Sequence, residues 1–215
     1  MPASSPTPLL PALSLTLAIV ALAGFVDAIS FLQFKGLFVS FMSGNTTSLG
    51  VAMAKDDVDK LQELALAISL FIGGVVLGTL LHNRAGDRWS ASLILSVVAA
   101  LLALAHAYPP LAIEGLTLGM GVLNASVHEV GGVKVSLTFV TGTLVKFGTG
   151  LANLLSGRQE SWDWLWQLTL WLGFLGGALA GAAALLHLPK AALLLAAFMS
   201  FALALLAALV PRGVR

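Results

Sequence analysis

Residues 37–50 read LFVSFMSGNTTSLG and interrupt a chain that is otherwise dominated by apolar side chains. The first five residues, LFVSF, favour an extended strand because β-branched and aromatic residues fit a pleated backbone. The run from Ser43 to Ser48 then gathers small and polar residues in one place. A strand-like piece, a turn at Ser43-Gly44 and a helical pattern after it predict a broken segment instead of one continuous helix.

The composition indicates that this break lies within a membrane protein. Of the 215 residues, 58% are hydrophobic and only 10% are charged, whereas a soluble domain has about 25% charged residues. In a bilayer, apolar side chains can face outward while backbone polar groups are paired internally. The net charge of +1, with no Lys/Arg-rich arm, speaks against nucleic-acid binding. The chain has no cysteine and therefore no disulfide or Cys metal site.

Apolar runs near the roughly 20 residues that span a bilayer divide residues 1–215 into eight segments of one polytopic domain. Residues 1–8 are rich in Pro and Ser and are expected to be a flexible N-terminus. The first, second, fifth and sixth segments are interrupted by polar residues, and the other four are not. The eight segments are 9–33, 37–54, 62–82, 89–108, 111–128, 135–156, 163–186 and 190–210.

An internal repeat organises these segments. Three pairs of similar stretches occur in the same order, at offsets of 97, 98 and 103: GFVDA (24–28) with GVLNA (121–125), FMSGNTTSLGVAMA (41–54) with FVTGTLVKFGTGLA (139–152), and FIGGVVLG (71–78) with FLGGALAG (174–181). We expect an all-α integral membrane protein of two four-segment repeats, about 9–108 and 111–210. The second segment of each repeat is broken into a strand-like piece and a half-helix.

The relative orientation of the repeats depends on how often each half crosses the membrane. Four crossings make the halves parallel, which is the arrangement we expect. The positive-inside rule then favours a cytoplasmic location for one set of loops, with both termini outside. If residues 39–45 form only a re-entrant element, each half crosses three times and the repeats are inverted. The loops expected in the cytoplasm carry Lys35, Arg84, Arg88, Lys134 and Lys190.

The two broken segments predict a substrate site. Broken helices leave N–H groups without partners at the new helix start, and many secondary transporters bind substrate at such starts near the midplane. Helix starts also attract anions, so we expect a small polar or anionic substrate. Alternatively, these hydroxyl groups cap helices or bond to their own backbone carbonyls. The candidate substrate-binding residues are Ser43, Gly44, Asn45, Thr46, Asn124, Thr141, Gly142 and Thr143.

Asp27 is the acidic residue inside the first segment. Intramembrane acids are functional candidates by default because a charge there is unfavourable, and Asp27 is expected to carry a coupling proton. Its repeat counterpart, Asn124, keeps the hydrogen bonding but does not titrate. Alternatively, Asp27 caps a helix or lies at the interface, since Gln33 and Lys35 follow closely.

Lys146 lies in the first turns of the sixth segment. It can pair with Asp27, attract an anionic substrate, or extend its ammonium group to the interface. His128 and Glu129 border the loop before the sixth segment and are further candidates for lining the path.

Glycines on two uninterrupted segments predict close helix packing, because small residues at a spacing of four let two backbones approach. This packing would join segments of one chain or form a homodimer seam. The glycines are Gly74 and Gly78 in the third segment, and Gly173, Gly177 and Gly181 in the seventh.

Enzyme signatures are absent from the sequence: it has no H-E-x-x-H metal site, G-x-S-x-G turn or P-loop. We expect no enzyme activity, no cofactor and no metal. A membrane scaffold remains an alternative, although it would not need two polar breaks. An intramembrane enzyme would have to use Asp27 with His128 or Lys146.

Residues 24–50 resemble the YoaK family of bacterial inner-membrane proteins. That family carries a G-x-x-D-A element followed by M-T-G-N-T, and here the second motif reads Met42–Thr46 with Ser43 in place of threonine. GVLNA and TFVTGTL resemble its downstream pattern. The resemblance covers the chain after residue 12. It implies a multi-pass protein of the bacterial inner membrane that transports small metabolites, without a named substrate.

Overall fold

The computed structural model describes residues 9–126, 140–158 and 162–209, and within these ranges the regular structure is entirely helical. Five stretches of these ranges are long and apolar enough to cross a membrane: Leu13–Gln33, Val58–Gly86, Arg88–Ala107, Trp164–His187 and Ala192–Leu209. The chain is therefore a multi-pass membrane protein, and its described part is all-α. The elements are α1 (Leu9–Gln33), α2 (Met42–Ala54), α3 (Val58–Ala107), the 3-10 turn η1 (Pro109–Leu111), α4 (Ala112–Ser126), α5 (Val140–Leu155), α6 (Trp164–His187) and α7 (Ala192–Leu209).

Helix α3 contains the third and fourth expected segments, 62–82 and 89–108. Gly86 divides it, with φ 67° and ψ 170°, outside the helical region. A positive φ of this size favours glycine, because a Cβ would clash with the backbone. The chain thus turns at Gly86 between two spans. At the start of the first span, the Asp57 side chain caps the helix by accepting a hydrogen bond from the Lys60 N–H at 3.1 Å.

Helix α2 differs from the expected segment 37–54. Its 13 residues correspond to roughly 20 Å at 1.5 Å per residue, which is shorter than the roughly 30 Å hydrocarbon core. The expected strand at residues 37–41 is wrong, because these residues form neither strand nor helix. No partner strand occurs for them within the described ranges, and side chains bind their backbone instead, as described below. Most of the second expected strand-like piece, residues 134–139, lies outside the described residues.

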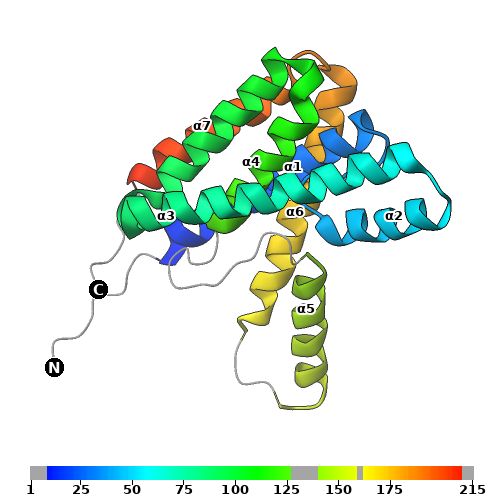
Figure 1. Cartoon of the computed structure of the whole chain (residues 1–215). Helices are drawn as coiled ribbons and strands as arrows, with labels where there is room; N and C mark the ends of the chain where they lie inside the picture. The colour runs from blue at the N-terminus through cyan, green and yellow to red at the C-terminus, as the bar shows by residue number, and fades with distance from the viewer. Residues whose placement is uncertain (1–8, 127–139, 159–161, 210–215) are drawn as a thin grey trace.

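The buried core is formed mainly by α1, α3 and α4, with contributions from α7. In Figure 1, α4 and α7 lie beside α3, while α5 lies beside the first half of α6, away from α2. A buried hydrogen bond joins α7 to α3, because the Ser200 hydroxyl donates to the Leu95 carbonyl at 2.8 Å. The largest fully buried side chains include Ile19, Leu22 and Ile29 of α1, Ile94, Leu95 and Leu102 of α3, and Leu116, Met120 and Leu123 of α4.

The glycine faces lie between helices of the same chain. A Cβ added to Gly177 or Gly181 in α6 would collide with the backbone of α1, at Ala21 and Phe25 respectively. In α3, a Cβ on Gly74 would collide with the Leu118 carbonyl of α4, and one on Gly78 would lie 2.7 Å from the Val122 carbonyl. Gly173 faces the Leu17 side chain. These faces are therefore used for packing within the chain.

Candidate functional site

The site begins where α1 ends and the chain turns back toward it. Lys35 and Gly36 both have positive φ, 49° and 87°, and the Gly36 N–H donates to the Phe31 carbonyl at 2.9 Å. Such a left-handed ending satisfies a carbonyl of the last helical turn, and it favours glycine. The next residues, 37–41, run along α1 before α2 begins at Met42, and we call them the braced loop.

Asp27 holds the braced loop from the side of α1. Its side chain is buried, with 3% exposure. One carboxylate oxygen accepts hydrogen bonds from the N–H groups of Val39 at 2.9 Å and Ser40 at 2.8 Å. The other oxygen accepts a hydrogen bond from the Ser40 hydroxyl. Three donors from the loop thus converge on one carboxylate in a membrane-spanning helix.

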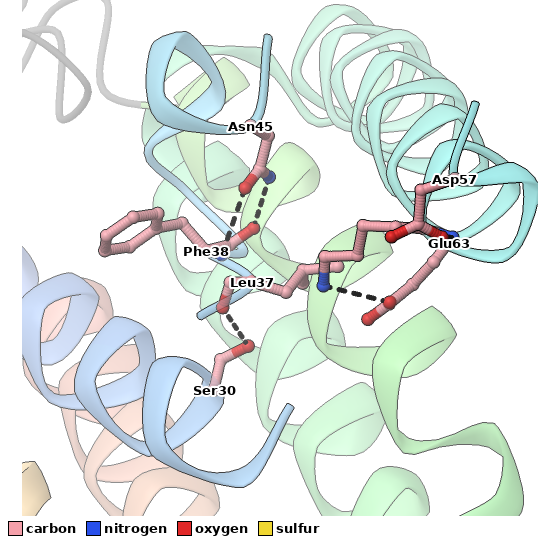
Figure 2. Close-up of polar contacts among 7 residues, drawn as sticks. Ser30, Leu37, Phe38, Asn45, Asp57 and Glu63 are labelled. Carbon is pink, nitrogen blue, oxygen red and sulfur yellow. Dashed lines mark hydrogen bonds and ion pairs between the residues drawn. The ribbon is translucent and has the colours of Figure 1, made fainter. Parts of the chain in front are cut away.

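Asn45 holds the same loop from the side of α2 (Figure 2). Its amide oxygen accepts from the Phe38 N–H at 3.1 Å, and its amide nitrogen donates to the Phe38 carbonyl at 2.6 Å. Figure 2 also shows the Ser30 hydroxyl of α1 donating to the Leu37 carbonyl, at 3.0 Å. Side chains therefore supply the partners that a neighbouring strand would otherwise give.

The aromatic residues around the braced loop pack on one another. The Phe38 ring lies 4.9 Å from the Phe31 ring and 5.3 Å from the Phe41 ring, measured between centroids. A Cβ on Gly44 would lie 2.7 Å from the Phe41 ring and 3.2 Å from the Phe38 ring. Gly44 thus provides room for these rings, which is a packing role.

Backbone dipoles, together with the Ser40 hydroxyl, surround the Asp27 carboxylate. Within the described ranges the one ion pair joins Lys60 and Glu63, 3.0 Å apart in the first turns of α3. Lys146 is exposed on α5 and forms no ion pair with Asp27 there. N–H groups that point at a carboxylate stabilise its charge, as they do for anions at helix starts. No group of metal-binding side chains occurs in the described part of the chain.

The hydroxyl groups near the two helix starts mostly bond within their own helices. Thr46 donates to the Met42 carbonyl at 2.8 Å, and Thr143 donates to the Val140 carbonyl at 2.7 Å. Ser43 and Thr141 are exposed in the first turns of α2 and α5. Such bonds to the preceding turn are common for Ser and Thr in helices, and they leave the hydroxyl oxygens able to accept further bonds.

The structure brings only some of the expected site residues together. Asp27, Gly44 and Asn45 meet at the braced loop, whereas Thr141, Gly142, Thr143 and Lys146 lie on α5, which packs on α6 and not on α2. Asn124 lies in α4, where its amide nitrogen donates to the Met120 carbonyl at 2.8 Å and its buried amide oxygen has no partner among the described residues. His128 and Glu129 lie outside the described residues.

Sequence reasoning missed the roles of Ser30 and Ser40. Ser30 follows Asp27 by three residues and therefore lies on the same face of α1, which is a signal that the sequence contained. Ser40 lies in a stretch expected to form a strand, so its hydroxyl was not assigned a partner in α1.

Comparisons with known proteins agree with this architecture. A family model described as a protein of unknown function (DUF1275) matches residues 15–206. The UPF0700 transmembrane protein RA0705 of Rhizobium meliloti is 37% identical over 170 residues, covering 79% of this chain and 74% of that protein. The UPF0700 transmembrane protein YoaK of Bacillus subtilis is 29% identical over 147 residues, covering 63% of this chain and 64% of that protein. No solved structure matches the chain significantly. The chain therefore belongs to the DUF1275 family, the family of YoaK-like transmembrane proteins.

Proposed function

We propose that this protein is a secondary transporter of a small polar or anionic metabolite in the bacterial inner membrane, coupled to protons through Asp27. The observation that carries the proposal is the buried Asp27 carboxylate, which binds the braced loop from within the span Leu13–Gln33. Acidic residues inside membrane spans mark proton relays and substrate paths. A purely structural anchor does not need a group that can titrate.

The protonation state of Asp27 is linked to how firmly it holds the loop. The ionised carboxylate accepts from Val39 and from both donors of Ser40. Hydrogen bonds to an ionised acceptor are roughly twice as strong as neutral ones. A proton on Asp27 therefore weakens the hold on the loop. We propose that this release moves the start of α2, where Ser43 and Thr46 are exposed.

The substrate class follows from the two short helices, whose starts carry partial positive charge. The first turn of α2 presents Ser43 and the first turn of α5 presents Thr141, both exposed. Each start by itself favours a ligand with hydrogen-bond acceptors or negative charge, because α5 packs on α6 and not on α2. Lys146, exposed on α5, adds a cation on the same helix.

Matching contacts support the internal repeat behind this proposal. A Cβ on Gly24 of α1 would collide with the Phe174 carbonyl, and one on Gly121 of α4 would collide with the Phe71 carbonyl. Gly121 follows Gly24 by the offset of 97, and Phe174 follows Phe71 by the offset of 103. Equivalent residues of the two proposed repeats thus make equivalent contacts.

The scaffold alternative has less support, because the glycine faces that would recruit a partner helix are covered by α1 and α4. Enzyme activity also has less support, because no His or Lys is hydrogen-bonded or ion-paired with Asp27 in the described part of the chain.

The experiment uses the purified full chain in proteoliposomes that contain a pH-sensitive dye. Mixtures of small carboxylates, phosphates, amino acids and neutral polar metabolites are added outside, and the internal pH is followed. At least one mixture should move protons in wild-type vesicles. Asp27→Asn should abolish that signal, while Asp59→Asn, which removes an exposed carboxylate outside the site, should retain it. If every mixture gives the response of protein-free liposomes, the transporter proposal fails.

A further inference from the structure

Close contacts define the directions in which neighbouring helices run. Where α1 contacts α6, the residue numbers of both helices increase in the same direction, so the two helices are parallel. The same holds for the first span of α3 and α4. Contacts between the second span of α3 and α4 run oppositely, because Leu101 meets Gly119 and Ala105 meets Gly115. The contacts that show these parallel directions are Leu17 with Gly173, Ala21 with Gly177, Phe25 with Gly181, Gly74 with Leu118, and Gly78 with Val122.

Figure 1 shows that the helix ends gather at two ends of the bundle. The beginning of α1, the turn between the two spans of α3, and the ends of α4 and α7 lie toward the left, and we call this the terminal end. The end of α1, the beginnings of α3 and α4, and the connection from α6 to α7 lie toward the right and top, and we call this the loop end. Helix α2 therefore leaves and returns to the loop end, in keeping with its 13 residues.

From these directions we infer that the two halves are inverted repeats, each crossing the membrane three times. The crossings are α1 and the two spans of α3 in the first half, and α4, α6 and α7 in the second. Helix α4 has only 15 described residues, and it is counted as a crossing because, unlike α2, it packs along both spans of α3. Helix α1 crosses from the terminal end to the loop end, and its counterpart α4 crosses in the opposite direction. The axis that relates such repeats lies in the membrane plane. The parallel arrangement expected from the sequence required α2 to cross.

The repeats are also interlocked in this arrangement. The first helix of each half packs on a glycine face of the other half. Helix α1 packs on α6, and α4 packs on the first span of α3. The two halves therefore cannot separate as independent bodies. Helices α2 and α5 become re-entrant elements that enter from opposite faces, and the braced loop bound by Asp27 belongs to the element that enters from the loop end.

The charges assign the terminal end to the cytoplasm. Lys and Arg residues accumulate in cytoplasmic segments, whereas Asp and Glu contribute little to orientation. Excluding Lys146, within α5, the described Arg84, Arg88 and Arg158 belong to the terminal end, and three further basic residues follow α4 or α7 in the sequence, the two helices that end there. Those three are Lys134, Arg212 and Arg215, and the four basic residues of the loop end are Lys35, Lys55, Lys60 and Lys190.

This inference rests on the internal repeat that the proposed function uses, but not on transport. A protein that transports nothing can still have this topology, and a transporter can have the parallel one. A measurement of topology therefore fails or succeeds independently of the proteoliposome experiment.

Because the chain has no cysteine, single cysteines report topology directly. Four variants place one at exposed positions: Ala54→Cys and His187→Cys at the loop end, and Asn83→Cys and Ser156→Cys at the terminal end. Bacterial cells expressing each full-length variant are treated with a membrane-impermeant maleimide, before and after permeabilisation. We expect Ala54→Cys and His187→Cys to be labelled in intact cells. Asn83→Cys and Ser156→Cys should be labelled only after permeabilisation.

The parallel arrangement gives a different grouping, with positions 54 and 156 on one face and positions 83 and 187 on the other. That result overturns the inverted repeat. The expected grouping with the faces exchanged overturns the cytoplasmic assignment of the terminal end and leaves the inverted relation standing. Lys35→Cys is an additional reporter, because it shares a face with position 54 only in the inverted arrangement. Labelling in denaturing detergent controls for the amount of each variant.

Discussion

The carboxylate of Asp27 accepts hydrogen bonds from both the backbone N–H and the hydroxyl of Ser40, a residue 13 positions further along the chain. One side chain of a membrane-spanning helix thus fixes the backbone that leads into the next helix. Asn45 binds the same loop at Phe38 from the other side. Two polar side chains thus supply backbone partners of the kind that a strand ladder would otherwise provide.

Asp27→Asn should preserve the fold, whereas Asp27→Ala should destabilise it. An Asn amide oxygen can still accept from the N–H groups of Val39 and Ser40, and its amide nitrogen can donate to the Ser40 hydroxyl. Alanine leaves these buried groups unpaired, at about 1–3 kcal/mol for each. Thermal unfolding of both variants in the same detergent measures the difference. Equal melting temperatures would mean that the loop does not depend on Asp27.

Asn45→Leu should also destabilise the protein, because it removes both partners of the Phe38 backbone. Each buried polar group left without a partner again costs about 1–3 kcal/mol. The control is Thr46→Val, which removes an exposed hydroxyl that bonds only to the preceding turn of α2. A melting temperature for Asn45→Leu as high as that of Thr46→Val would show that the amide does not support the loop.

Gly177→Ala should lower the stability of the contact between α1 and α6. The added Cβ collides with the Ala21 backbone, and overpacking of this kind typically costs 1–3 kcal/mol. Gly176→Ala is the matched control in the next position, because nothing lies within 4 Å of its Cβ. It should be neutral or stabilising, since alanine favours helix by about 1 kcal/mol over glycine. The reverse order of melting temperatures would contradict the packing described.

Gly150→Ala should loosen α5 from α6. A Cβ at position 150 collides with the Trp164 ring, which also packs on Phe147 at 5.4 Å between ring centroids. Gly148→Ala adds the same methyl group where nothing lies within 4 Å. Tryptophan fluorescence should shift for position 150 and stay unchanged for position 148. An unchanged spectrum for both variants would argue against the contact.

The long apolar helices could be predicted from the sequence, because their hydrophobic runs are much longer than any loop. The described helix α1 coincides with the expected 9–33, and α6 and α7 each begin and end within two residues of expectation. Helix α3 was divided at nearly the right place because polar residues surround Gly86. The membrane class is confirmed by the family and by the five spans.

The candidate site could be predicted only in part. The sequence singled out Asp27 and Asn45 as polar residues in apolar surroundings, but it could not show that they bind one loop. Residues 37–41 have strand-forming side chains, yet no second strand lies beside them in the part of the chain that the structure describes. Their backbone partners lie up to 13 residues away, in positions that only the turn at Lys35 and Gly36 brings together.

The central claim is that Asp27 carries the coupling proton, and gradient-driven uptake tests it most directly. Once a substrate is found, proteoliposomes of wild type, Asp27→Asn and the control Asp59→Asn are compared in two assays. In the first, a proton gradient drives accumulation; in the second, labelled substrate exchanges without a gradient. We predict that Asp27→Asn loses accumulation and keeps exchange, while the control keeps both. Full gradient-driven accumulation by Asp27→Asn would contradict the claim and leave Asp27 with a structural role.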